Sequence, residues 1–246
     1  MRIADRVEAL DLSMTFGERT TSIYPLLFWD QSDGATLIDS GFPGQFAALE
    51  KAIITAGVEL ADIQRVIITH QDIDHIGNLS EIVQATGARV LAHAEEAPYI
   101  QGDRPLIKAD PKRLEQRLQA LSEKQRQQAL RLFTKPPTAH VDQYLADGEN
   151  LPFHGGIRVL HTPGHTPGHI CIYIASCRLL VAGDELHVEN GEMLGPNPEN
   201  TFDMEKARWS LRKLAAMSDL IDFVLCYHGG LFGPRAGDRL QVLAAV

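Results

Sequence analysis

The segment THQDIDHIGN places four potential metal ligands within six residues, namely His70, Asp72, Asp74 and His75. A single histidine here would fit a buried core, and Asp74 alone would fit a cap for the helix expected after it. Two imidazoles and two carboxylates at one point of the chain, however, would repel one another or stay unpaired without a cation among them. The segment therefore predicts a metal site.

The spacing within this segment indicates two neighbouring ions. Residues two positions apart in an extended segment face the same way, so His70 and Asp72 can bind one ion. Asp74 and His75 follow after the chain turns, and they can bind a second ion beside the first.

A second histidine-rich segment, HTPGHTPGH, covers residues 161–169. Its prolines and glycines predict a compact loop that presents side chains from a fixed backbone. His165 is the expected ligand, whereas His161 and His169 are expected to pack or to orient a ligand through a hydrogen bond. Asp184 and His228 stand at the ends of two further apolar runs, where they too are candidates for chemistry.

These side chains need strands to position them, and the flanking sequence predicts such strands. RVIITH is short, apolar and β-branched, as in a buried strand, and it stops at His70. Helical spacing is expected over residues 43–56, 78–86 and 202–216. Further strand-like runs are VEALDLS, SIYPLLFWD, GATLIDS, ARVLAH, GIRVLHTPG, HICIYIAS, RLLVAGDEL and DFVLCYH.

Residues 101–140 differ from the rest because they are rich in Lys, Arg and Gln, with leucines at helical spacing. We expect a single domain over residues 1–246 with this segment inserted as a helical cap. The cap is either a solvated helix packed on the body or a lid that shapes the substrate pocket. Tyr99, Ile100 and Phe133 are its candidates for substrate contact.

Composition argues against several classes of partner. The net charge of −9 and the dispersed basic residues disfavour a nucleic acid. No apolar run approaches the roughly 18 residues of a membrane span, and the N-terminal segment lacks a signal-peptide core, so a cytoplasmic protein without a membrane partner is expected. The expected partner is a small-molecule substrate, and a homodimer through the cap or a sheet edge is compatible with the sequence.

The ordered segments LIDSGFPG, THQDIDH, HTPGHTPGH, VAGDEL and CYHGG resemble the metallo-β-lactamase superfamily. The resemblance runs from Asp39 to His228 and implies an α/β fold, a four-layer αββα sandwich with the site at one edge of the two sheets. It also implies that Asp39 hydrogen-bonds a ligand histidine, which we favour over the alternative that this residue only caps the following loop. The implied ligands are His70, Asp72 and His165 for a first metal, Asp74, His75 and His228 for a second, and Asp184 as the bridge.

One position departs from the family pattern HxHxDH, because Asp72 stands where the second histidine is usual. Aspartate is itself a competent ligand, and its charge hardens the site, which shifts preference from zinc towards iron or manganese. The alternative is that the first metal site is lost. A carboxylate at this position is similar to flavodiiron proteins, whose attached flavodoxin domain has no counterpart in this sequence.

These features predict a metal-dependent hydrolase with two divalent ions per chain. Two cations about 3.5–4 Å apart acidify a bridging water, so that hydroxide is available near neutral pH. The leading hypothesis is attack of this hydroxide on a small ester, lactone or thioester, with Asp74 orienting the hydroxide or moving its proton. The alternatives are hydrolysis of a phosphodiester or phosphotriester, and a diiron protein that handles oxygen.

The resemblance to acyl-homoserine lactonases and to glyoxalase II supports the acyl class in general terms. The sequence ELHVENGE after Asp184 lacks the tyrosine expected in a lactonase. The chain after His228 is too short for the helical domain with which glyoxalase II binds glutathione. Neither named activity therefore follows from the sequence.

Overall fold

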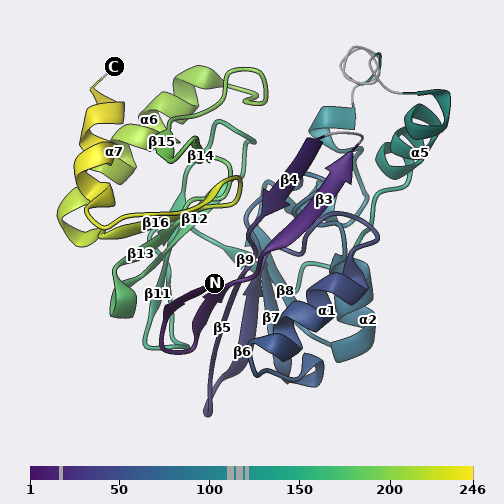
Figure 1. Cartoon of the computed structure of the whole chain (residues 1–246), viewed down its shortest axis with the longest axis horizontal. Helices are drawn as coiled ribbons and strands as arrows, with labels where there is room; N and C mark the ends of the chain where they lie inside the picture. The colour runs from purple at the N-terminus through teal and green to yellow at the C-terminus, as the bar shows by residue number, and fades with distance from the viewer. Residues whose placement is uncertain (17–18, 110–113, 115–118, 120–121, 246) are drawn as a thin grey trace.

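The computed structural model describes residues 1–16, 19–109, 114, 119 and 122–245. Two β-sheets pack face to face, and helices cover the outer face of each sheet (Figure 1). This arrangement is the four-layer αββα sandwich that the sequence motifs imply. In the part of the chain that the structure describes, no helix is both long and apolar enough to cross a membrane.

The first sheet combines antiparallel and parallel pairing. From β1 to β6 its strands are antiparallel, and from β6 to β9 they are parallel. Helices α1 (Phe46–Thr55) and α2 (Leu79–Thr86) connect the parallel strands and bury their apolar sides against the sheet. In spatial order the strands are β1 (Arg2–Ala4), β2 (Val7–Ala9), β5 (Leu26–Asp30), β6 (Gly34–Ile38), β7 (Ile63–Ile68), β8 (Arg89–His93) and β9 (Gln143–Leu145).

The second sheet is formed by the last third of the chain and is covered by α6 (Met204–Ala215) and α7 (Ala236–Ala244). Asp203 caps α6 by accepting hydrogen bonds from the backbone N–H groups of Glu205 and Lys206. In spatial order the strands are β10 (Asn150–Leu151), β11 (Ile157–His161), β12 (Ile170–Ile174), β13 (Leu179–Val181), β16 (Phe223–Cys226) and β17 (Gly230–Phe232).

Strand β12 shows how the sequence fills the layers. Ile170, Ile172 and Ile174 join the core between the two sheets, whereas Cys171 and Tyr173 join the core beneath α6 and α7. Successive side chains of a strand point to opposite faces, so a strand buried on both faces reads as an unbroken apolar run. The two sheets are therefore held rigidly relative to each other next to the loops that leave their strand ends.

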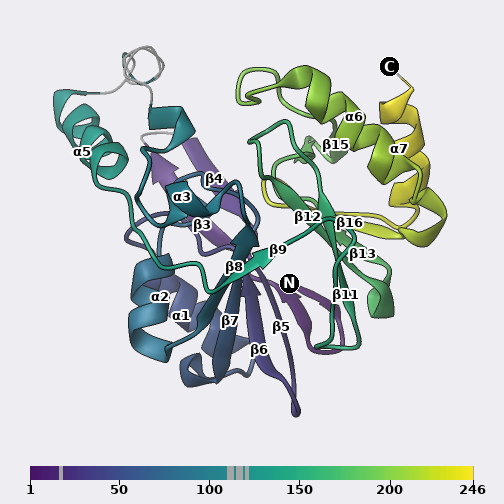
Figure 2. The same cartoon turned by 180° about the vertical axis from the view of Figure 1, so that it is seen from behind.

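Two β-hairpins and several short helical segments complete the described structure. The hairpins are β3 (Leu12–Phe16) with β4 (Arg19–Ile23), and β14 (His187–Glu189) with β15 (Glu192–Leu194). The helix α3 (Ala97–Ile100) follows β8, and α5 (Glu123–Thr134) stands out beyond it in the view from behind (Figure 2). The short 3-10 segments are Leu60–Asp62, Ile107–Ala109, Ala175–Cys177 and Ser218–Leu220.

The predicted helices over residues 43–56, 78–86 and 202–216 are present with slightly shorter bounds, as α1, α2 and α6. The run SIYPLLFWD was wrong as one strand, because the chain leaves β4 at Ile23 and enters β5 at Leu26, on either side of Pro25. VEALDLS likewise divides between β2 and β3. Within the expected cap, α5 is helical, while Leu118 and Leu121 lie outside the described residues.

Candidate metal centre

Loops from both sheets bring the predicted ligands to one edge of the sandwich. His70 follows β7, His165 lies between β11 and β12, Asp184 follows β13, and His228 follows β16. The potential donor atoms form two groups, and within each group they lie within 4.8 Å of one another. The first group contains His70, Asp72, His165 and Asp184, and the second contains Asp74, His75 and His228.

The second group and Asp184 together have the geometry of an ion-binding site. The Nε2 atom of His75 lies 3.2 Å from Oδ1 of Asp184, and Nε2 of His228 lies 3.2 Å from Oδ2 of Asp74 and 3.4 Å from Oδ2 of Asp184. The buried His75 Nε2 and Asp184 Oδ1 atoms have no hydrogen-bond partner among the described residues. Because unpartnered buried polar atoms are costly, imidazole and carboxylate donors arranged in this way fit a divalent ion.

The first group already holds a cation that the sequence did not reveal. The Nε2 atom of His165 lies 2.9 Å from Oδ2 of Asp72 and 3.4 Å from Oδ2 of Asp184. The Nζ atom of Lys108 contacts the same Asp72 oxygen and lies 2.8 Å from His165 Nε2. The residue types in this group suit a divalent ion, but two of its donor atoms are shared with the lysine amine.

The charges of this cluster depend strongly on one another. Burial disfavours a charged His228, yet Asp184 and Asp74 outweigh burial and raise the pKa of its imidazole to about 10. Burial also disfavours a charged His75, but three neighbouring carboxylates outweigh burial and raise the pKa of this imidazole. Burial together with His75 lowers the pKa of His70 to about 4. The carboxylates therefore stabilise positive charge at this edge of the sandwich.

Asp39 lies behind His75, as the family resemblance suggests. Its Oδ2 atom lies 2.9 Å from His75 Nδ1, and its two oxygens also accept hydrogen bonds from the backbone N–H and the hydroxyl of Thr69. Since the carboxylate accepts, Nδ1 carries the hydrogen, which leaves Nε2 as the ring atom that would bind a metal ion. Asp39 thus sets the orientation of His75.

His169 supports the site from the second sheet without joining either donor group. Its Nε2 atom accepts a hydrogen bond of 3.1 Å from the backbone N–H of Asp184. Its Nδ1 atom lies 2.9 Å from the hydroxyl of Thr162, to which it therefore donates. His169 thus holds the backbone of Asp184 in place.

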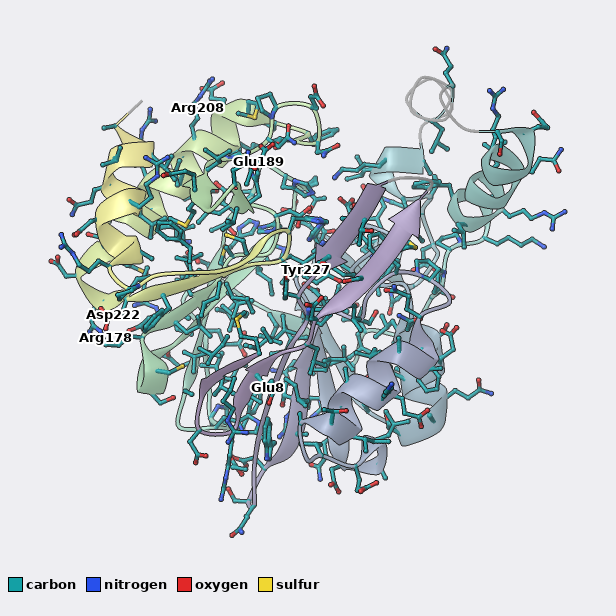
Figure 3. The ribbon with its side chains drawn as sticks, viewed as in Figure 1. Glu8, Arg178, Glu189, Arg208, Asp222 and Tyr227 are labelled. Atoms are coloured by element: carbon teal, nitrogen blue, oxygen red, sulfur yellow. The ribbon has the colours of Figure 1, made fainter. Side chains whose placement is uncertain are left out.

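Two supporting residues escaped the sequence analysis. The buried Glu96 accepts hydrogen bonds from the backbone N–H of Gln71 at 2.8 Å and from that of Gly168 at 2.7 Å, which ties the two histidine loops together. Tyr227 donates its hydroxyl hydrogen to the carbonyl of Asp74 at 2.5 Å and lies near the middle of the molecule (Figure 3). The CYHGG motif marks Tyr227 only as the neighbour of a ligand, and no local signal marks Glu96.

Several other candidates lie away from the donor groups. His161 stacks on His93 with ring centroids 4.0 Å apart, and its Nε2 atom lies 3.0 Å from the Pro167 carbonyl. Glu185, the residue after Asp184, is buried, neither of its carboxylate oxygens has a partner among the described residues, and burial raises its pKa. Cys171 and Cys226 are buried free thiols in the core beneath α6 and α7.

A cavity of about 220 Å³ opens beside both donor groups. Tyr99 and Ile100 pack in the core beneath α1 and α2, so of the three cap candidates only Phe133 lines this cavity. Its apolar lining residues are Phe42, Ile73, Leu106 and Phe133, and its polar lining residues are Asp72, Asp74, Lys108, Asp184, Asn200 and His228.

Comparisons with known proteins find relatives among hydrolases. The chain is 28% identical over 222 residues to the probable metallo-hydrolase YflN of Bacillus subtilis, which covers 85% of this chain and 80% of that protein. It is 28% identical over 167 residues to the hydroxyacylglutathione hydrolase GloC of Haemophilus influenzae, with 65% of each chain covered.

Solved structures share the same fold. A metallo-β-lactamase family protein of Thermus thermophilus superposes with a TM-score of 0.73 at 25% identity, covering 99% of this chain and 80% of that one. The family model of the metallo-β-lactamase superfamily matches residues 21–228, a range that includes every donor residue described above. The chain belongs to the metallo-β-lactamase superfamily.

Proposed function

We propose that this protein is a metal-dependent hydrolase that cleaves small esters, lactones or thioesters. The observation that carries the proposal is that both donor groups border one small cavity whose lining combines apolar and polar side chains. Asp74, Asp184 and His228 line this cavity of about 220 Å³ together with Phe42 and Phe133. A compact acyl group suits such a cavity, since apolar side chains and a few convergent polar groups are typical of small-molecule sites.

The second donor group would hold the ion that activates water. Asp74, His75, His228 and Asp184 would be its ligands, and these donor types accept zinc and equally iron or manganese. When bound, a divalent cation lowers the pKa of water and polarises the oxygen of a substrate. The two-ion prediction from the sequence additionally requires Lys108 to leave Asp72 and His165.

Asp74 is the proposed proton acceptor. Its carboxylate lines the cavity, so it can take the proton of an attacking water and give it to the leaving oxygen or sulfur of the substrate. The Tyr227 hydroxyl holds the Asp74 backbone in place through the Asp74 carbonyl. Phe42 and Phe133 line the cavity, and a substrate bound against them would displace water and so strengthen the electrostatic interactions there.

The relatives support an acyl substrate. GloC is named for the hydrolysis of a hydroxyacylglutathione, and YflN is named a probable metallo-hydrolase. The net charge of −9 also disfavours a polyanionic substrate such as a nucleic acid. Small, weakly charged acyl compounds are therefore the first class to test.

The proposal is tested by metal-dependent turnover. Protein stripped of metal and then reloaded with zinc, iron(II) or manganese(II) is assayed with an aryl ester, a γ-lactone, an acyl thioester and an activated phosphodiester. We expect turnover of a carboxylic substrate that chelator abolishes and added metal restores. Faster turnover of the phosphodiester would replace the acyl proposal with phosphoesterase activity, and metal-independent or absent turnover of all four would refute it.

A matched pair of variants tests the role of Asp74. Asp74→Asn is expected to lower kcat about 100-fold or more, because general-base catalysis contributes roughly 100- to 10,000-fold. Asp62→Asn makes the same chemical change at an exposed position and should retain wild-type kcat. Equal activity in both variants would remove Asp74 from the mechanism.

A further inference from the structure

Lys108 is a buried cation placed on donor atoms that a first metal ion would use. Its residue is only 9% exposed, and its Nζ atom contacts Oδ2 of Asp72 and lies 2.8 Å from Nε2 of His165. An N–H group that donates to His165 Nε2 occupies the lone pair through which that atom would bind a metal. A divalent ion and the Lys108 amine therefore compete for the same position.

The backbone around Lys108 is tied to the two histidine loops. The N–H of Ile107 donates to Oε1 of Gln71 at 2.8 Å, and Gln71 in turn donates to Glu96 through its backbone and side-chain nitrogens at 2.8 and 3.1 Å. Glu96 also accepts from the backbone N–H of Gly168. These buried hydrogen bonds fix the backbone next to Lys108. The long Lys108 side chain therefore extends from a fixed backbone position towards Asp72.

Charge explains why aspartate stands at position 72. Lys108 and Asp72 are both buried, and neither charge would be stable there without the other. A histidine at position 72 would offer the lysine no countercharge. Asp72, which departs from the family motif, and Lys108, which contacts the first donor group, thus form one ion pair.

From this geometry we infer that the Lys108 ammonium takes the place of the first metal ion, so that the chain holds one divalent ion, in the group of Asp74, His75, His228 and Asp184. The inference rests on the proposed function, since it assumes that this second group binds metal. Lysine supplies a fixed positive charge and N–H donors to the cavity. Acidifying water remains the task of the single ion.

Metal stoichiometry tests this inference without any substrate. Metal-free wild type, Lys108→Met and Lys51→Met are saturated with zinc, dialysed against metal-free buffer and analysed by elemental mass spectrometry. We expect one zinc per chain for the wild type and for Lys51→Met, whose substitution lies at an exposed position, and two for Lys108→Met. Two zinc ions in the wild type, or no gain in Lys108→Met, would overturn the inference.

A second measurement covers the case in which Lys108→Met does not fold. Anomalous diffraction from zinc-soaked wild-type crystals should show one peak near His228 and none between Asp72 and His165. Two peaks would overturn the inference. The proposed function can fail separately from this inference. One zinc per chain without hydrolysis of any tested compound would contradict the proposed function and support the inference. The absence of bound zinc would contradict both.

Discussion

Glu96 and Gln71 form a buried two-point hydrogen bond, in which Oε2 of Glu96 accepts from both the backbone nitrogen and the side-chain amide of Gln71. Through its other oxygen Glu96 binds the backbone of Gly168, so a single carboxylate links the loop of His70 to the loop of His165. The site therefore depends on a residue that would bind no metal.

Replacing Glu96 should destabilise the protein and loosen the metal site. Glu96→Ala leaves buried N–H groups unpaired, and each such group costs about 1–3 kcal/mol, so a loss of roughly 2–5 kcal/mol in the free energy of unfolding is expected. Glu95→Ala at the exposed neighbouring position should change it by less than about 0.5 kcal/mol. Urea unfolding of both variants measures the difference, and equal stabilities would show that Glu96 does not link the loops.

Asp39→Asn should weaken metal binding more than it weakens the fold. The amide retains acceptor capacity towards Thr69, but it lacks the charge that holds His75 Nδ1 in its protonated form. Loss of such a supporting partner typically costs about 10- to 100-fold in metal affinity. Zinc competition against a chromophoric chelator measures the affinity, with exposed Asp62→Asn as the control. An unchanged zinc affinity would contradict the orienting role.

Two tyrosines provide a matched test of the contact beneath the site. The Tyr227 hydroxyl bonds the carbonyl of Asp74, and the Tyr173 hydroxyl bonds the carbonyl of Leu220 at 2.9 Å, a contact that involves no donor residue. Tyr173→Phe removes one such bond and should cost about 1 kcal/mol of stability, whereas Tyr227→Phe also removes the acceptor of the buried Gly41 N–H and should cost more. Only Tyr227→Phe should also reduce kcat and zinc affinity, because only that bond holds a donor residue. Equal effects of the two changes on kcat would show that the Tyr227 hydroxyl has no special role.

Asp30 should contribute stability that disappears in acid. Its Oδ1 atom accepts from the backbone N–H groups of Ser32 and Asp33 at 2.8 and 2.6 Å in the turn between β5 and β6. Burial opposes the charged form, but these hydrogen bonds, with the Ser32 hydroxyl and His154, lower the pKa of Asp30 from 3.8 to about 2. Because the folded-state pKa is the lower one, the contribution is complete above about pH 4 and is lost as the pH falls towards 2.

The measurement compares the unfolding free energies of wild type and Asp30→Asn between pH 7 and the lowest pH at which both fold. We expect the wild type to be more stable at pH 7 and the gap to narrow below about pH 4. A gap that stays constant down to pH 3 would mean that the turn does not depend on the charge of Asp30.

The sequence by itself predicted most of the longer strands, three of the helices and a set of candidate donor residues, because those signals are local. Apolar periodicity appears within a few residues, and His70 to His75 are adjacent in the chain. It did not predict α7 or β17, and it joined β4 to β5 across Pro25, since short apolar runs do not define where a strand leaves its sheet.

Only the tertiary structure decided what surrounds the donors. Lys108 meets Asp72 across 36 positions of the chain, and His165 meets Asp72 across 93. Such contacts depend on how two sheets pack and where long loops return, which no local pattern records. The sequence shows that Asp72 departs from its family motif, but only the folded chain places a buried ammonium beside that carboxylate, because charge pairing acts through space rather than along the chain.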